Sequence, residues 1–84
     1  MGVMVSKQEI AEWFDRGVQQ RATHLIVVCD TFDWDDYPVL VMPGENVKDK
    51  YSEYHDKNMQ TVMEVYNLSL DKNEQLEDRR VFNF

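Results

Sequence analysis

Apolar residues form two short runs in the first half of the chain, one on each side of an acidic segment. The first run, residues 25–29, is continuous, which indicates a strand covered on both faces and therefore central in its sheet. The second run, residues 39–42, lies between Pro38 and Pro43. Because proline cannot donate a hydrogen bond to a β-ladder, we expect both prolines at strand ends. The two runs therefore predict an antiparallel hairpin.

The segment before these strands has the spacing of an amphipathic helix. Ser6 and Glu9 match the S-x-x-E capping box, in which each side chain satisfies a backbone N–H at the helix start. Apolar residues then recur every three or four positions, as on one buried helix face: Ile10, Trp13, Phe14 and Val18. We predict a helix over residues 7–20. Gly17 costs roughly 1 kcal/mol inside it and is expected where a strand packs closely.

The second half of the chain predicts two more helices and one more strand. Asn46 suits the N-cap of a helix whose inner face comprises Val47, Tyr51 and Tyr54. Residues 60–68 also have a spacing that fits a helix, but their β-branched and aromatic residues favour a strand. A capping pair, Asp71 and Glu74, predicts a last helix over residues 72–81 with two inward-facing side chains, Leu76 and Val81.

Together these elements predict an α+β fold with the order αββαβα, in a single globular domain over residues 1–84. A crossover through the second helix should return the chain beside the first strand. The result is a small antiparallel three-stranded sheet in the order 2-1-3, with helices packed on it. Phe82 and Phe84 predict that the end of the chain docks onto the body of the protein or onto a second subunit. Docking onto a second subunit would make a homodimer, and the sequence leaves both alternatives open.

Charge and hydropathy restrict the classes of partner. Sixteen acidic and nine basic residues give a net charge of −7. This argues against nucleic acid, because phosphate contacts need clustered Lys and Arg. No apolar run approaches the ~20 residues of a membrane span, and the first residues lack the features of a signal peptide. We expect no membrane association and a cytoplasmic location.

The sequence contains none of the common catalytic patterns. It has no G-x-S-x-G and no phosphate-binding glycine loop. Its two histidines, His24 and His55, lack the spacing of zinc ligands. Cys29 lies in the most apolar run, so we expect a structural residue and not a nucleophile. The sequence predicts neither an enzyme nor a cofactor.

The acidic segment between the two strands is the candidate site. It contains four carboxylates whose oxygens suit Ca²⁺ or Mg²⁺: Asp30, Asp33, Asp35 and Asp36. The segment starting at Asp33 does not match a calcium-binding EF-hand loop. Pro38 stands at the sixth position, where the loop requires Gly, and Gly44 stands at the twelfth, where a Glu should bind the ion through both oxygens. A looser metal site and an ordinary aspartate-capped turn stay open. So does a recognition loop, since aromatic residues on polar loops often anchor interfaces; it would consist of Asp33, Trp34, Asp35, Asp36 and Tyr37.

The chain resembles a group of short uncharacterised proteins encoded in bacterial and bacteriophage genomes, most clearly in the segment THLIVVCDTFDWDDYPV. This resemblance implies a cytoplasmic accessory protein of bacteriophage type, and it assigns no catalytic residue. Our first hypothesis is a small non-catalytic acidic protein that binds a protein partner through the acidic-aromatic loop. The alternatives are a small-ligand or divalent-metal binder and a nucleic-acid charge mimic that blocks a basic host protein.

Overall fold

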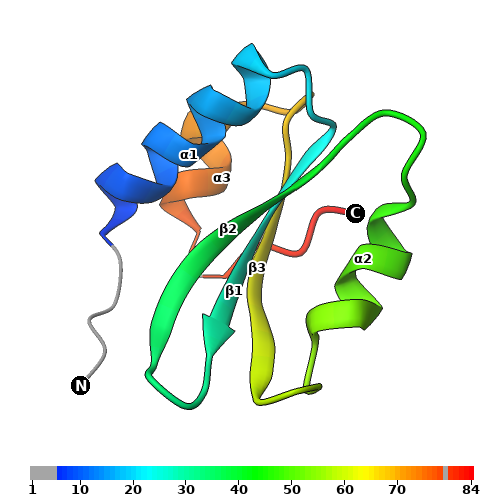
Figure 1. Cartoon of the computed structure of the whole chain (residues 1–84). Coiled ribbons are helices and arrows are strands. Elements are labelled where there is room, and N and C mark those ends of the chain that lie inside the picture. The colour runs from blue at the N-terminus through cyan, green and yellow to red at the C-terminus, as the bar shows by residue number, and fades with distance from the viewer. Residues whose placement is uncertain (1–5, 79) are drawn as a thin grey trace.

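The computed structural model describes residues 6–78 and 80–84. Along the chain it contains α1 (Lys7–Gln19), β1 (His24–Asp30), β2 (Asp35–Val41), α2 (Val47–Tyr54), β3 (Gln60–Asn67) and α3 (Lys72–Glu77). Both β2 and β3 pair antiparallel with β1, so the order in the sheet is β2-β1-β3 (Figure 1). This confirms the predicted α+β fold, the element order and the sheet order. The strand predicted over residues 60–68 is also confirmed, as β3, which ends at Asn67.

Helices cover both faces of the sheet, α1 and α3 on one side and α2 on the other (Figure 1). The buried cluster under α1 and α3 consists of Ile10, Phe14, Leu25, Val27, Tyr66 and Val81. The cluster under α2 consists of Ile26, Val28, Val41, Val62 and Val65. Alternate side chains of a strand point to opposite faces, so β1 contributes to both clusters. Residues 25–29 are all buried, as predicted for a central strand.

β2 begins earlier than the sequence predicted. We expected Pro38 to precede the strand, but it lies inside β2 and pairs with Val27. Because β2 is an edge strand of the described sheet, the Pro38 nitrogen can face away from β1 without the loss of a ladder hydrogen bond. The predicted loop is therefore shorter: Asp35, Asp36 and Tyr37 are strand residues.

The start of α1 agrees with the prediction, whereas its buried face differs. The Ser6 side chain accepts the N–H of Glu9 at 3.2 Å, as in a capping box. Val18, expected on the inner face, is 50% exposed. Gly17 is buried instead, because Leu40 and Leu68 approach the helix so closely there that no side chain fits without displacement. The expected close approach of a strand at Gly17 is confirmed.

The last helix ends earlier than predicted, and the residues after it form a tail along the outer edge of β3. α3 stops at Glu77, not at residue 81. Val81 is nevertheless buried, and the N–H of Val65 donates to its carbonyl at 2.7 Å. Phe82 and Phe84 pack edge-on against Tyr51 of α2, with ring centroids 6.4 and 5.2 Å away. The end of the chain thus docks onto the body of the protein.

Candidate interaction site at the hairpin tip

The turn between β1 and β2 places two aromatic side chains in solvent. Asp30 organises this turn: Oδ1 accepts the N–H of Phe32 at 2.8 Å, and the backbone oxygen accepts the N–H of Trp34 at 2.6 Å. Aspartate favours such turns because its carboxylate bonds to the backbone two residues further on. Phe32 is 71% exposed and Trp34 is 62% exposed. Asp30 therefore fixes the backbone that carries both aromatic residues.

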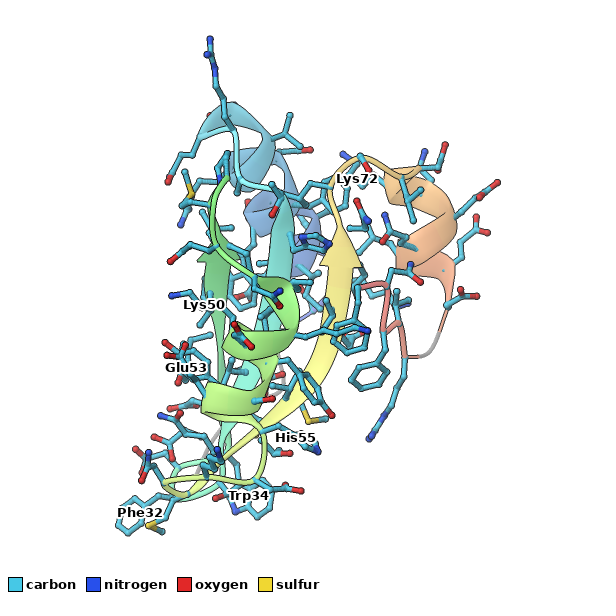
Figure 2. The ribbon with its side chains drawn as sticks, turned by 90° about the vertical axis from the view of Figure 1, so that its right-hand side faces the viewer. Phe32, Trp34, Lys50, Glu53, His55 and Lys72 are labelled. Carbon is cyan, nitrogen blue, oxygen red and sulfur yellow. The ribbon has the colours of Figure 1, made fainter. Side chains whose placement is uncertain are left out.

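A third exposed apolar side chain comes from the turn between α2 and β3. Met59 is 59% exposed, and its carbonyl accepts the N–H of Thr31 at 2.8 Å. This hydrogen bond joins the two turns at one end of the sheet. Figure 2 shows Phe32 and Trp34 at that end, with Lys72 near the opposite one. We call the three exposed residues Phe32, Trp34 and Met59 the tip.

Two of the three tip residues have a left-handed backbone. Trp34 has a φ of 60° and Met59 a φ of 60°. For residues with a Cβ this conformation costs on the order of 1–2 kcal/mol, whereas glycine adopts it freely. Residues held in such conformations concentrate at functional sites. The side chains of Trp34 and Met59 therefore occupy positions where backbone stability alone would favour glycine.

Exposed carboxylates adjoin the tip in both turns. Asp33 and Asp35 flank Trp34 in the sequence, and Asp56 lies in the turn that contains Met59; all three are exposed. Asp30, half-buried at the end of β1, contributes a further carboxylate nearby. The charged side chains that border the apolar surface of the tip are thus mostly carboxylates, with Lys57 as a positive charge in the turn of Met59.

Two of the five predicted recognition residues lie beside the core instead of in the turn. Tyr37 packs against the cluster under α2, where burial above all raises its pKa. Asp36 is half-buried and pairs with Cys29 across the ladder. Because adjacent strand residues point to opposite faces, these two side chains cannot form one surface. The structure brings together Asp33, Trp34 and Asp35 only.

The thiol of Cys29 lies in an environment that suppresses its reactivity. Burial, and after it the neighbouring Asp36 carboxylate, raises the pKa of Cys29 to about 11. Nucleophilic attack requires the thiolate. At neutral pH this thiol stays protonated, in agreement with the structural role predicted for it.

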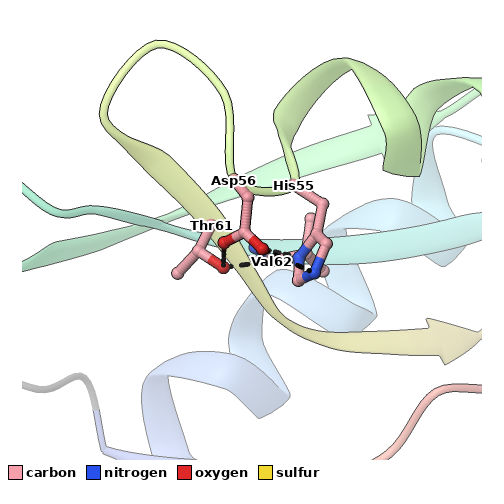
Figure 3. A network of polar contacts seen from close by, with 4 residues as sticks. All are labelled: His55, Asp56, Thr61 and Val62. Carbon is pink, nitrogen blue, oxygen red and sulfur yellow. Dashed lines mark hydrogen bonds and ion pairs between the residues drawn. The ribbon is translucent and has the colours of Figure 1, made fainter.

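A polar network supports the turn that carries Met59 (Figure 3). The Thr61 hydroxyl donates to Asp56 Oδ1 at 3.0 Å, and His55 Nε2 lies 3.3 Å from Asp56 Oδ2. His55 Nδ1 accepts the N–H of Val62 at 3.3 Å. These residue types also occur in nucleophilic triads, in which the histidine takes the hydroxyl proton. Here Nδ1 accepts the hydrogen bond from Val62 N–H, and the Thr61 hydroxyl, 3.3 Å from Nδ1, donates to the carboxylate, so the network stabilises the turn.

The four aspartates considered as metal ligands do not converge. Within residues 6–78 and 80–84, no group of three or more His, Cys, Asp or Glu side chains is placed to hold a metal ion. Asp30 Oδ1 bonds to the backbone of its own turn, and Asp36 faces a different side of the sheet from Tyr37 and the α2 cluster. The arrangement suits the capping of a turn.

Sequence reasoning missed two of the three tip residues. Phe32 lies in the acidic segment but was not among the predicted site residues, although its place between Asp30 and Asp33 was a usable signal. Met59 had no such signal. It is 25 residues or more from Phe32 and Trp34 in the sequence, and only the pairing of β1 with β3 brings it to the same end.

His24, at the start of β1, is a second titratable feature of the fold. The Thr23 hydroxyl donates to the carbonyl of Val41 at 3.1 Å, so its oxygen accepts a hydrogen bond from the N–H of His24 Nδ1, 2.9 Å away. This leaves Nε2 unprotonated; it is buried and has no hydrogen-bond partner in the described part of the chain. Burial lowers the pKa of His24, and the backbone of Phe84 acts in the opposite direction.

We expect the protein to lose stability as the pH falls below about 6.5, the ordinary pKa of histidine. Between the lowered pKa of folded His24 and 6.5, the unfolded chain binds more protons, so the free energy of unfolding rises with pH. Urea denaturation at several pH values measures this slope, which is at most about 1.4 kcal/mol per pH unit for one proton. The slope should decrease in His24→Leu. An NMR titration midpoint for His24 at or above 6.5 would contradict the prediction.

Comparisons with protein families, with curated proteins and with solved structures found no match to this chain. Within the described residues, none of the helices is long and apolar enough to span a membrane.

Proposed function

We propose that this chain is a small non-catalytic binding protein that engages another protein through the tip. The observation that supports this best is the exposure of three large apolar side chains, Phe32, Trp34 and Met59, on two turns joined by a hydrogen bond. Single exposed apolar residues are ordinary. Three at one end of a sheet, two of them with a left-handed backbone, form a pre-arranged anchor. A bacteriophage-type accessory protein, which the sequence resemblance implies, fits this function.

The charge around the tip defines the chemistry of the partner. Asp33, Asp35 and Asp56 are exposed beside the apolar residues, and the whole chain carries a net charge of −7. Complementary potentials direct association and exclude partners of like charge. The partner should therefore offer an apolar pocket for Trp34, bordered by Lys or Arg side chains. Its association rate should fall as salt is added, because exposed charges are screened.

Trp34→Ala is expected to abolish most of the binding. Tryptophan is the commonest type of interface anchor, and truncation of such an anchor costs 2 kcal/mol or more, about 30-fold in affinity. The measurement begins with crosslinking of the tagged wild-type chain in a bacterial lysate. The recovered protein is then titrated against purified variants by biolayer interferometry.

Leu70→Ala is the matched control. Leu70 is 51% exposed but follows the opposite end of β3 from the tip, so its truncation should leave the affinity within about twofold. Equal binding by Trp34→Ala and the wild type would overturn the proposal. So would the recovery of no protein above the background of Trp34→Ala, or an association rate independent of salt.

A further inference from the structure

A hollow lies between α1 and the edge strand β2, away from the tip. Its volume is about 230 Å³, and its walls are formed by Trp13, Arg16, Gln20, Pro38 and Leu40. Trp13, Arg16 and Gln20 follow one another at spacings of three and four residues, which places them on one side of the helix. Pro38 and Leu40 are two residues apart in β2 and so point to the same face of the sheet.

The walls of this hollow combine an apolar pocket with one cationic group. Trp13, Pro38 and Leu40 supply an aromatic ring, a saturated ring and a branched aliphatic chain. Arg16 is the only charged residue among the lining side chains. Within the described part of the chain no carboxylate forms an ion pair with it, although the chain has sixteen acidic residues. The guanidinium fork of Arg16 is therefore available beside an apolar surface.

We propose that this hollow binds a small aromatic carboxylate. The guanidinium group of arginine pairs with a carboxylate through two parallel hydrogen bonds, which adds orientation to charge attraction. The ring of the ligand would lie against Trp13 and Leu40 while the Gln20 amide provides a further polar contact. Small-molecule sites have this composition of mostly apolar walls and a few converging polar groups. A volume of about 230 Å³ suits a free molecule with one small aromatic ring system, such as phenyl or indole, and not a folded partner.

The indole N–H of Trp13 can report binding in this hollow by NMR. Trp13 lines the hollow, whereas Trp34 belongs to the tip. In an NMR titration with indole-3-acetate, the indole N–H resonance of Trp13 should shift and saturate, and that of Trp34 should stay in place. A ligand of this size binds with a Kd on the order of 0.1–1 mM.

Two comparisons test the role assigned to Arg16. Indole-3-acetamide has the same ring without the charge, so its binding should be about tenfold weaker or more. Arg16→Gln should weaken the binding of indole-3-acetate by a similar factor. Lys48→Gln makes the same change in net charge on α2, across the sheet, and should bind like the wild type. Unchanged backbone resonances away from the hollow show that each variant is folded.

The proposal is overturned if acid and amide bind equally, or if Lys48→Gln weakens binding as much as Arg16→Gln. It also fails if the Trp34 resonance moves in place of that of Trp13, or if no shift saturates below about 20 mM. Trp34→Ala should keep the ligand, because the hollow and the tip share no residue. The result of the ligand titration is therefore independent of whether the tip binds a protein partner.

Discussion

Leu25→Ala is expected to lower the free energy of unfolding by about 3–5 kcal/mol. Leu25 is completely buried in β1, in the cluster that also contains Ile10 and Phe14. Its truncation removes apolar contacts and leaves a cavity that rigid neighbours on the sheet and on α1 fill only in part. A domain of this length has a total stability on the order of 4–12 kcal/mol. The variant should therefore lose roughly a quarter or more of the total stability.

Urea denaturation followed by circular dichroism measures this loss for Leu25→Ala. Leu70→Ala removes the same atoms from a side chain that is 51% exposed. It should change the free energy of unfolding by less than about 0.5 kcal/mol. A loss below 1 kcal/mol in Leu25→Ala would mean that β1 is not the buried centre of the sheet.

Gly17→Leu is expected to destabilise the fold by about 2–3 kcal/mol. A Cβ at this position would lie 2.8 Å from Leu68 Cδ1 and 3.0 Å from Leu40 Cδ2, both inside van der Waals contact. A single methyl group can be accommodated, because the two contacting atoms are the ends of flexible leucine side chains. A whole leucine side chain cannot, and it must move α1 away from β2.

Gly17→Ala is the control that separates crowding from helix propensity. Alanine favours a helix over glycine by roughly 0.5–1 kcal/mol, which offsets the small shift of Leu40 and Leu68. The free energy of unfolding of Gly17→Ala should stay within about 1 kcal/mol of the wild type. If thermal and urea denaturation show Gly17→Leu to be as stable as Gly17→Ala, α1 does not pack this closely on the sheet.

The candidate site was only partly predictable from the sequence. Local chemistry was sufficient for the turn: an acidic segment between two apolar runs places Trp34 in a hairpin connection, and the structure leaves it exposed. The ends of that connection were predicted wrongly. Pro38 was taken as a strand boundary, but an edge position in the sheet makes a proline inside β2 acceptable. Tyr37 was consequently assigned to the turn and in fact packs beside the core.

The hollow between α1 and β2 was also not predictable from the sequence. Trp13 belongs to the apolar stripe of the predicted first helix, and Arg16 lies three residues further along the same helix. Their joint use with Pro38 and Leu40 requires α1 to lie across β2, and the small residue Gly17 permits this approach. The hydrophobic period of α1 or of β2 alone does not show that the two elements pack against each other.

The sequence by itself determined the six elements, their order, and the central place of β1 in the sheet. It did so because caps, hydrophobic period and a continuous apolar run are local properties. Tertiary structure alone decided which exposed side chains become neighbours. Met59 reaches Phe32 and Trp34 through the pairing of β1 with β3 and the bond from Thr31 to its carbonyl. Such contacts depend on the closure of long loops and on strand register, and these are fixed only when the whole core packs.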